Sequence, residues 1–169
     1  KKKNLKKQEE DFKKILPQLK LKQTVQEGKQ ESKIYVGFEG LKTYYDEILK
    51  KASKKDEYLA MTFSDKSLDN KSISLMFQKF HQKRAEKGFK AKILCNVDDK
   101  LTQNKMNYSK TGLYEFKTTN QIIPTGIAIF QDIVATYNWG KVPRVFVIIC
   151  KENADQYRKF FYDLWRSAK

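Results

Sequence analysis

Long apolar runs, cysteines and a secretion signal are scarce or missing in this chain of 169 residues. Apolar stretches such as Val145 to Cys150 are far shorter than the roughly 20 residues that cross a bilayer, so no membrane span is expected. The chain starts with KKKN, without an initiator Met or an apolar signal core. Cys95 and Cys150 sit in apolar runs, which favours packing over a disulfide. We therefore expect a piece of a larger cytoplasmic protein.

Residues for catalysis and metal binding are also few. His81 is the single histidine, and because Gln82, Lys83 and Arg84 follow it we expect it on a solvated helix face. No Cys or carboxylate stands at metal-ligand spacing from His81. The seven glycines are scattered, so no Walker or Rossmann phosphate loop occurs. The sequence therefore predicts a protein that is not an enzyme and that needs no metal and no cofactor.

Positive charge is abundant. The chain has 35 Lys and Arg against 20 Asp and Glu, a net charge of +15. Such a charge attracts polyanions, but lysines spread along a chain are also ordinary solvated faces. One cluster interleaves cations with aromatic rings near residue 85 and suggests a nucleic-acid-binding module as the alternative function: Lys79, Lys83, Arg84 and Lys87 with Phe80 and Phe89.

The first 27 residues carry a narrow apolar stripe at near-heptad spacing: Leu5, Phe12, Ile15, Leu16 and Leu19. A helix with such a stripe cannot bury it alone, although Pro17 is awkward for a continuous helix. We expect residues 1–27 to form a coiled-coil-like linker and dimerisation helix. The chain is accordingly expected to be a homodimer.

Residues 33–169 alternate strand and helix patterns and predict one α/β domain. Strands are expected at residues 34–36, 58–63, 91–95, 113–116, 126–130, 133–137 and 144–150, with a two-residue hairpin turn at Gln131-Asp132. Helices are expected from Glu39 to about Ala52, from the capping residues 69–72 to Gly88, and from an Asn153 cap to the end. The expected fold is a mixed, largely parallel sheet flanked by helices.

Four segments resemble the C-terminal domain of TrmB-like archaeal transcription regulators. They are Tyr35 to Lys42, Phe80 to Asn96, Gly126 to Asp132 and Tyr157 to Trp165. The resemblance implies a phospholipase-D-like fold that senses an effector and contributes dimer contacts. It also implies that DNA is bound by a winged-helix domain upstream of Lys1.

The same resemblance bears on catalysis. Phospholipase D enzymes carry His-x-Lys-x(4)-Asp, in which His is the nucleophile and Lys holds the phosphate. With Asp132 at the Asp of that motif, Thr125 stands at the His and Ile127 at the Lys. Threonine has no comparably basic nitrogen and isoleucine has no charge, so the resemblance implies that catalysis is lost.

An effector pocket is expected where the strands end, because ligands of open α/β sheets collect there. The residues that could line it are Ser64, Asp65, Asn96, Thr125, Asn138 and Trp139. The sugar-sensing members of the family use a further C-terminal subdomain beyond this segment, so the effector is not specified as a sugar.

Overall fold

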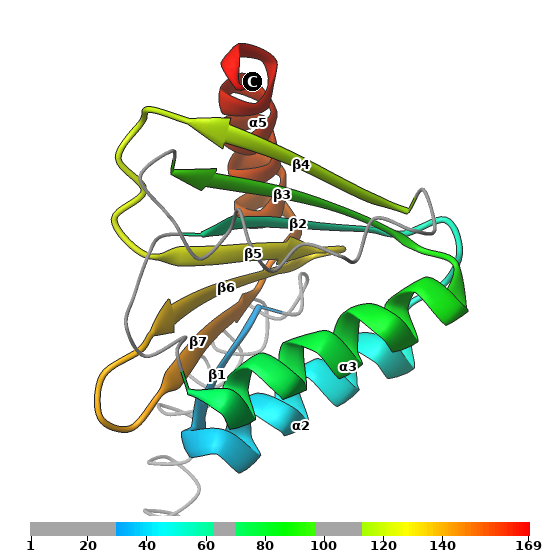
Figure 1. Cartoon of the computed structure of the whole chain (residues 1–169), viewed down its shortest axis with the longest axis vertical. Coiled ribbons are helices and arrows are strands. Elements are labelled where there is room, and N and C mark those ends of the chain that lie inside the picture. Colours follow the sequence, from blue (N-terminus) through cyan, green and yellow to red (C-terminus); the bar gives the residue numbers. More distant parts are fainter. Residues whose placement is uncertain (1–29, 63–69, 97–112) are drawn as a thin grey trace, which may run out of the picture. The chain divides into compact units, whose positions relative to one another are not determined.

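The computed structural model describes residues 30–62, 70–96 and 113–169. One mixed sheet has the strand order β1-β7-β6-β5-β2-β3-β4. Helices α2 and α3 cover one of its faces and α5 covers the other (Figure 1). The elements are β1 (Glu31–Val36), α2 (Gly37–Lys51), β2 (Glu57–Thr62), α3 (Lys71–Lys87), β3 (Lys90–Asn96), β4 (Tyr114–Thr119), β5 (Gly126–Phe130), β6 (Ile133–Asn138), β7 (Arg144–Ile149) and α5 (Lys151–Ser167).

Strand directions confirm the expected mixed sheet. The pairs β2-β3 and β3-β4 are parallel, whereas β1-β7, β7-β6, β6-β5 and β5-β2 are antiparallel. Of the described strands only β5 and β7 therefore run against the common direction. The strand β1 does not neighbour β2 as consecutive strand-helix-strand units suggest. It pairs instead with β7, and β7, β6 and β5 lie between β1 and β2 in the sheet.

Local sequence explains both ends of α3. The Asn70 side chain accepts a hydrogen bond of 2.9 Å from the Ser72 N–H and caps α3. Gly88 ends α3 with φ of +82°, a conformation that costs glycine little. The expected Asn153 cap is wrong: Cys150, three residues earlier, is the N-cap of α5, which begins at Lys151. The reason is that β7 leads directly into the helix, with the Cys150 N–H donating to the Asp132 carbonyl oxygen.

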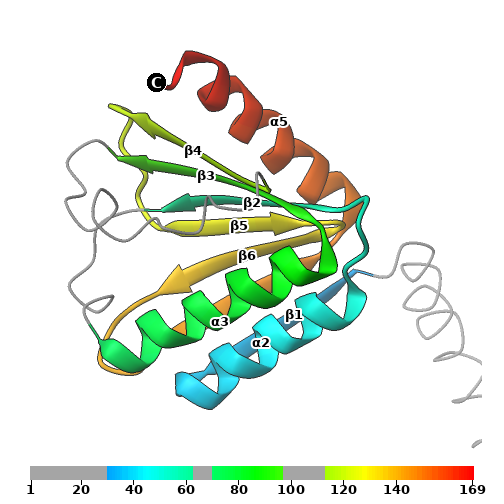
Figure 2. The ribbon, with the colours of Figure 1, turned by 45° about the vertical axis from the view of Figure 1, so that its right-hand side comes forward.

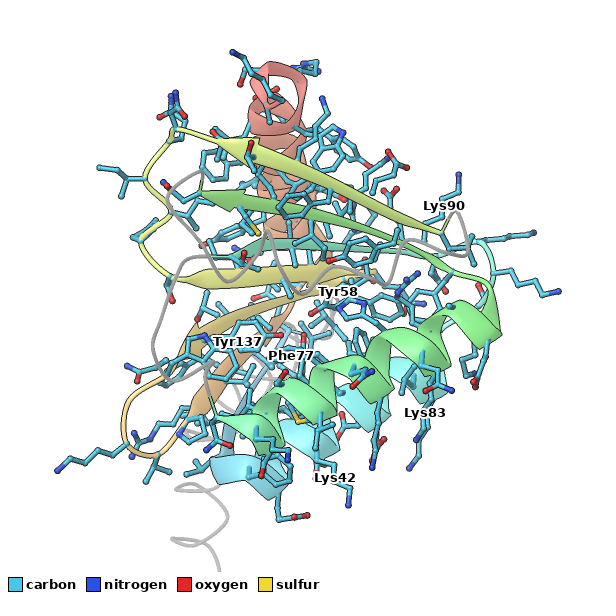
Figure 3. The ribbon with its side chains drawn as sticks, in the orientation of Figure 1. Lys42, Tyr58, Phe77, Lys83, Lys90 and Tyr137 are labelled. Carbon is cyan, nitrogen blue, oxygen red and sulfur yellow. The ribbon has the colours of Figure 1, made fainter. Side chains whose placement is uncertain are left out.

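Alternating strand residues build a separate core on each face. The face under α2 and α3 is rich in tyrosine. The Tyr45 hydroxyl donates to the Tyr137 hydroxyl at 2.9 Å, and the Tyr58 hydroxyl lies 3.3 Å from the same oxygen. Burial raises the pKa of all three hydroxyls, so they stay protonated. Figure 3 shows Tyr58 and Tyr137, with Phe77, between the sheet and the helices.

The end of the chain is fixed to the β4 edge of the sheet. Lys169 and Thr118 exchange two backbone hydrogen bonds of 2.7 and 3.0 Å. The Lys117 ammonium donates to the carbonyl oxygens of Trp165 and Ala168, both at 3.0 Å, and lies over the Trp165 ring. A cation at these carbonyls also complements the negative end of the helix dipole. These contacts hold the last turn of α5 against the sheet.

Candidate functional site

The candidate site lies at the edge where β2, β3, β4 and β6 end and β5 begins. The antiparallel pairing of Met61 with Ile127 brings the end of β2 beside the start of β5. The parallel pairing of Thr62 with Cys95 and of Asn96 with Thr119 aligns the ends of β2, β3 and β4. The topology thus places Asn96, Thr125 and Asn138, three of the residues predicted to line a pocket, at this edge.

At the start of β5 the side chains are held by the protein itself. The Thr125 hydroxyl donates to the Tyr137 carbonyl oxygen at 2.6 Å. Ile127 is buried in the core under α5. Asp132 lies in the hairpin turn at the opposite end of β5, where Gln131 has φ of 51°. The predicted two-residue turn is therefore confirmed, and Asp132 is an exposed turn residue.

The amides at this edge bind neighbouring backbone. The Asn96 side-chain amide donates to the Gln121 carbonyl oxygen at 3.1 Å. The Asn138 side-chain oxygen accepts from the Gly140 N–H at 3.1 Å. A ligand that used these groups would have to replace such bonds, which anchor the loops after β4 and β6. Ser64 and Asp65 lie outside the described residues, as do the dimerisation residues Leu5, Phe12, Ile15, Leu16 and Leu19.

Two threonines at the same edge were not predicted from the sequence. The Thr62 oxygen lies 2.6 Å from the Cys95 sulfur, and the buried Thr119 hydroxyl accepts from the Gln121 N–H at 3.1 Å. Both threonines are the last residues of their strands. A polar residue that closes an apolar strand is the signal that could have found Thr62, whereas β4 is itself polar and gives no such signal for Thr119.

Trp139 does not offer a stacking face to a ligand. Its ring is buried and stacks on Tyr137, with the ring centroids 5.4 Å apart and the planes at 6°. The Phe77 ring of α3 packs edge-on against it at 5.9 Å. The expectation that Trp139 lines a pocket is corrected: α3 lies over the end of β6 and makes the indole part of the core.

Arg84 and His81 are buried, against the expectation of a solvated basic helix face. The Arg84 guanidinium donates to the carbonyl oxygens of Phe89 and Leu113, and its Nε donates to His81 Nδ1 at 3.3 Å. Burial lowers the pKa of His81 to about 3, and the Arg84 charge acts in the same direction. The predicted nucleic-acid cluster therefore keeps the exposed Lys79, Lys83 and Lys87 but loses Arg84.

In the described part of the chain, no three His, Cys, Asp or Glu side chains group in a way that could hold a metal ion. No helix among the described residues has the length and apolar character needed to span a membrane.

No protein-family model and no curated protein sequence matches this chain, but solved structures do. TrmBL2, described as an archaeal chromatin protein with a novel mode of DNA binding, matches with a TM-score of 0.57 and 16% identity. That match covers 96% of this chain, which spans only 64% of the TrmBL2 chain.

Two further solved structures match over nearly their whole length. Nuc from Salmonella typhimurium, a phospholipase D family member, has a TM-score of 0.57 and 16% identity over 83% of this chain and 97% of its own. NucT from Helicobacter pylori has a TM-score of 0.56 and 12% identity over 83% of this chain and 98% of its own. These likenesses show that the mixed sheet between α2-α3 and α5 is a phospholipase-D-like fold.

Proposed function

We propose that this chain is a non-catalytic module of a TrmB-like, DNA-associated transcription regulator and that it holds two copies of the regulator together. The observation that carries the absence of catalysis is the identity and the bonding of Thr125 and Ile127. These residues stand where a phospholipase D motif needs its His nucleophile and its phosphate-binding Lys. The Thr125 hydroxyl donates a hydrogen bond to the Tyr137 carbonyl oxygen, and Ile127 is packed beneath α5.

Loss of catalysis follows from what these side chains can do. A hydroxyl needs an adjacent base before it can attack a phosphate, and the hydrogen of Thr125 points to a carbonyl oxygen. The single histidine, His81, is buried among aromatic rings on α3, and the lowered pKa keeps it neutral. A neutral hydroxyl and an alkyl group can line a pocket but cannot carry out this chemistry.

Hydrolysis of bis-p-nitrophenyl phosphate and of plasmid DNA tests this part of the proposal. We expect no turnover above the buffer blank. Turnover that is lost in Thr125→Ala or His81→Ala, with thermal unfolding unchanged, would make the chain an enzyme and overturn the proposal.

An apolar face on β1 and β7, which no element of the described residues covers, supports the pairing of two copies. Ile34 and Val36 of β1 are 62% and 51% exposed, and Phe146 and Ile148 of β7 are 40% and 46% exposed. Ile34 stands directly opposite Phe146 in the register. Tyr35, Val145 and Val147 alternate with these residues and pack on the opposite face under α2. Contiguous exposed apolar groups on neighbouring strands are typical of an interface.

The charge distribution favours a second copy as the occupant of this face. Two chains of net charge +15 repel each other. The six side chains that β1 and β7 direct to this face are Ser32, Ile34, Val36, Arg144, Phe146 and Ile148. Only Arg144 is charged, and it lies at one end of the patch, opposite Val36. Two copies meet here with little repulsion, and a two-fold axis lets the same patch serve both.

Sedimentation velocity of wild-type protein and Phe146→Glu tests the dimer. We expect a dimer for wild type and a monomer for the variant, because the aromatic contact is lost and a carboxylate is desolvated in each half of the interface. Leu75→Glu, with a side chain that is 46% exposed on α3, is the matched control and should leave the dimer intact. A monomeric wild type, or an equal effect of both variants, contradicts the proposal.

DNA and effector binding complete the proposed role. TrmBL2, which shares this fold, is a DNA-binding chromatin protein, and a winged helix encoded upstream of Lys1 would supply the DNA contact here. A thermal-shift screen with sugars, nucleotides and phosphates tests for an effector at Asn96, Thr125 and Asn138. The absence of any shift counts against effector sensing and leaves the dimerisation role to be judged by sedimentation.

A further inference from the structure

A groove separates the two helices that cover the tyrosine-rich face of the sheet. Figure 2 shows α2 and α3 side by side across this face, and the space between their outer surfaces has a volume of about 310 Å³. Buried side chains of both helices form its floor: Tyr45, Leu49, Met76 and Phe80. The groove is therefore apolar at its base and open to solvent along the two helices.

Two apolar side chains extend this floor to the surface. Phe38 of α2 is 39% exposed and Leu75 of α3 is 46% exposed, and both line the groove. A single exposed apolar residue is ordinary, but two beside an apolar floor form a continuous strip. The strip could be covered only by a ligand with apolar groups of its own.

The rim of the groove is basic. Lys42, Lys79 and Lys83 line it, and Asp46 is the single carboxylate among its described lining residues. Lys42 has only a 3.9 Å contact with the exposed Glu39 on its own helix, and among the described residues no carboxylate lies within ion-pair distance of Lys79 or Lys83. Figure 3 shows Lys42 and Lys83 pointing outward from α2 and α3. The three ammonium groups are thus available to carboxylates of a partner.

We propose that the groove between α2 and α3 binds an acidic amphipathic helix of a partner protein. A helix that lies in a groove inserts apolar residues from successive turns, and the apolar strip provides their contact surface. Glutamates and aspartates that flank such a stripe would lie beside Lys42, Lys79 and Lys83. A nucleic-acid backbone satisfies the lysines but leaves Phe38 and Leu75 in water, so the apolar strip favours the acidic helix over nucleic acid.

Fluorescence anisotropy with a designed peptide tests this inference. The probe is a labelled helix of about four turns with Leu on one face and Glu on the others, and its controls are a scrambled peptide and a peptide with Lys in place of Glu. We expect saturable binding of the probe and no saturable binding of either control peptide. We also expect Leu75→Gln and the double variant Lys79→Glu/Lys83→Glu each to weaken binding by about tenfold or more.

A matched double variant separates the groove from general charge attraction. Lys141→Glu/Lys159→Glu changes the net charge equally at exposed positions before β7 and on α5, and should change affinity less than about twofold at physiological salt. Thermal unfolding confirms that each variant is folded. No binding, equal binding of the scrambled peptide, or equal loss in both double variants overturns the proposal. A second result overturns the proposal as well: duplex DNA displaces the probe, and Leu75→Gln leaves the affinity for DNA unchanged. The groove would then be a phosphate-binding surface.

Discussion

The Thr125 hydroxyl donates a 2.6 Å hydrogen bond to the carbonyl oxygen of Tyr137, which joins the start of β5 to the end of β6. Thr125→Val keeps the shape of the side chain and removes the donor. We expect the free energy of unfolding to fall by about 1 kcal/mol, measured by urea denaturation. Thr43→Val removes a comparable hydrogen bond from the exposed Thr43 side chain of α2 to the Glu39 carbonyl oxygen. This variant should lower the free energy of unfolding by only a few tenths of a kcal/mol. Equal losses in both variants would show that the Thr125 bond has no special role.

Arg84 ties the end of α3 to the segments that start β3 and β4. Its guanidinium donates to the carbonyl oxygens of Phe89 and Leu113 and lies 5.9 Å from the centres of the Phe89 and Tyr114 rings. Arg84→Met removes the guanidinium donor of the Phe89 carbonyl and one donor of the Leu113 carbonyl, which keeps the Ala91 N–H, and we expect a loss of about 3 kcal/mol in chemical denaturation. Lys83→Met, one residue away and exposed, should stay within about 0.5 kcal/mol of wild type. A small effect of Arg84→Met contradicts the anchoring role.

His81 gives the folded state a dependence on pH. Its pKa falls from the usual 6.5 to about 3 in the folded protein because of burial and the Arg84 charge, and the rings of Phe80, Tyr58 and Tyr114 surround it. Below pH 6.5 the His81 side chain binds a proton in the unfolded chain but stays neutral in the folded chain. Stability is therefore complete above pH 6.5 and declines as the pH falls toward 3.

Urea denaturation of wild type and His81→Gln between pH 7 and 5 measures how much His81 contributes to the pH dependence of stability. We expect the wild type to lose up to about 1.4 kcal/mol for each pH unit below 6.5 through this one proton. The glutamine variant keeps an acceptor for Arg84 and should have a flatter pH profile. Parallel profiles for the two proteins would show that His81 is not the titrating group.

Tyr44 and Tyr137 should respond differently to loss of the hydroxyl. The Tyr137 oxygen bonds the hydroxyl of Tyr45, whereas the buried Tyr44 hydroxyl has no hydrogen-bond partner among the described residues. Tyr137→Phe is expected to cost about 1 to 2 kcal/mol because Tyr45 loses its acceptor. Tyr44→Phe is expected to be neutral or slightly stabilising, since it removes an unsatisfied polar atom. Thermal and urea unfolding check both, and a large loss in Tyr44→Phe contradicts the assignment.

Elements whose causes are local were predictable. The short apolar runs at residues 126–130 and 133–137 and the two-residue turn between them set the β5-β6 hairpin, and Gly88 set the end of α3. The start of α5 was not predictable, because Asn153 is a good cap residue, whereas in the structure the Ala154 N–H already donates to the Cys150 carbonyl oxygen. The place of β1 at the far edge of the sheet depends on strands more than 100 residues later.

The sequence alone determined that residues 125 and 127 carry a hydroxyl and an alkyl side chain, because side-chain chemistry is fixed by identity. It also determined the amphipathic faces of α2 and α5, since helical periodicity is a local property. Tertiary structure decided which polar side chains are buried. Arg84 and His81 lie beside lysines in the sequence, yet β3, β4 and their leading residues enclose them. Burial depends on segments distant in the chain, and the same packing places Trp139 in the core and opens the groove between α2 and α3.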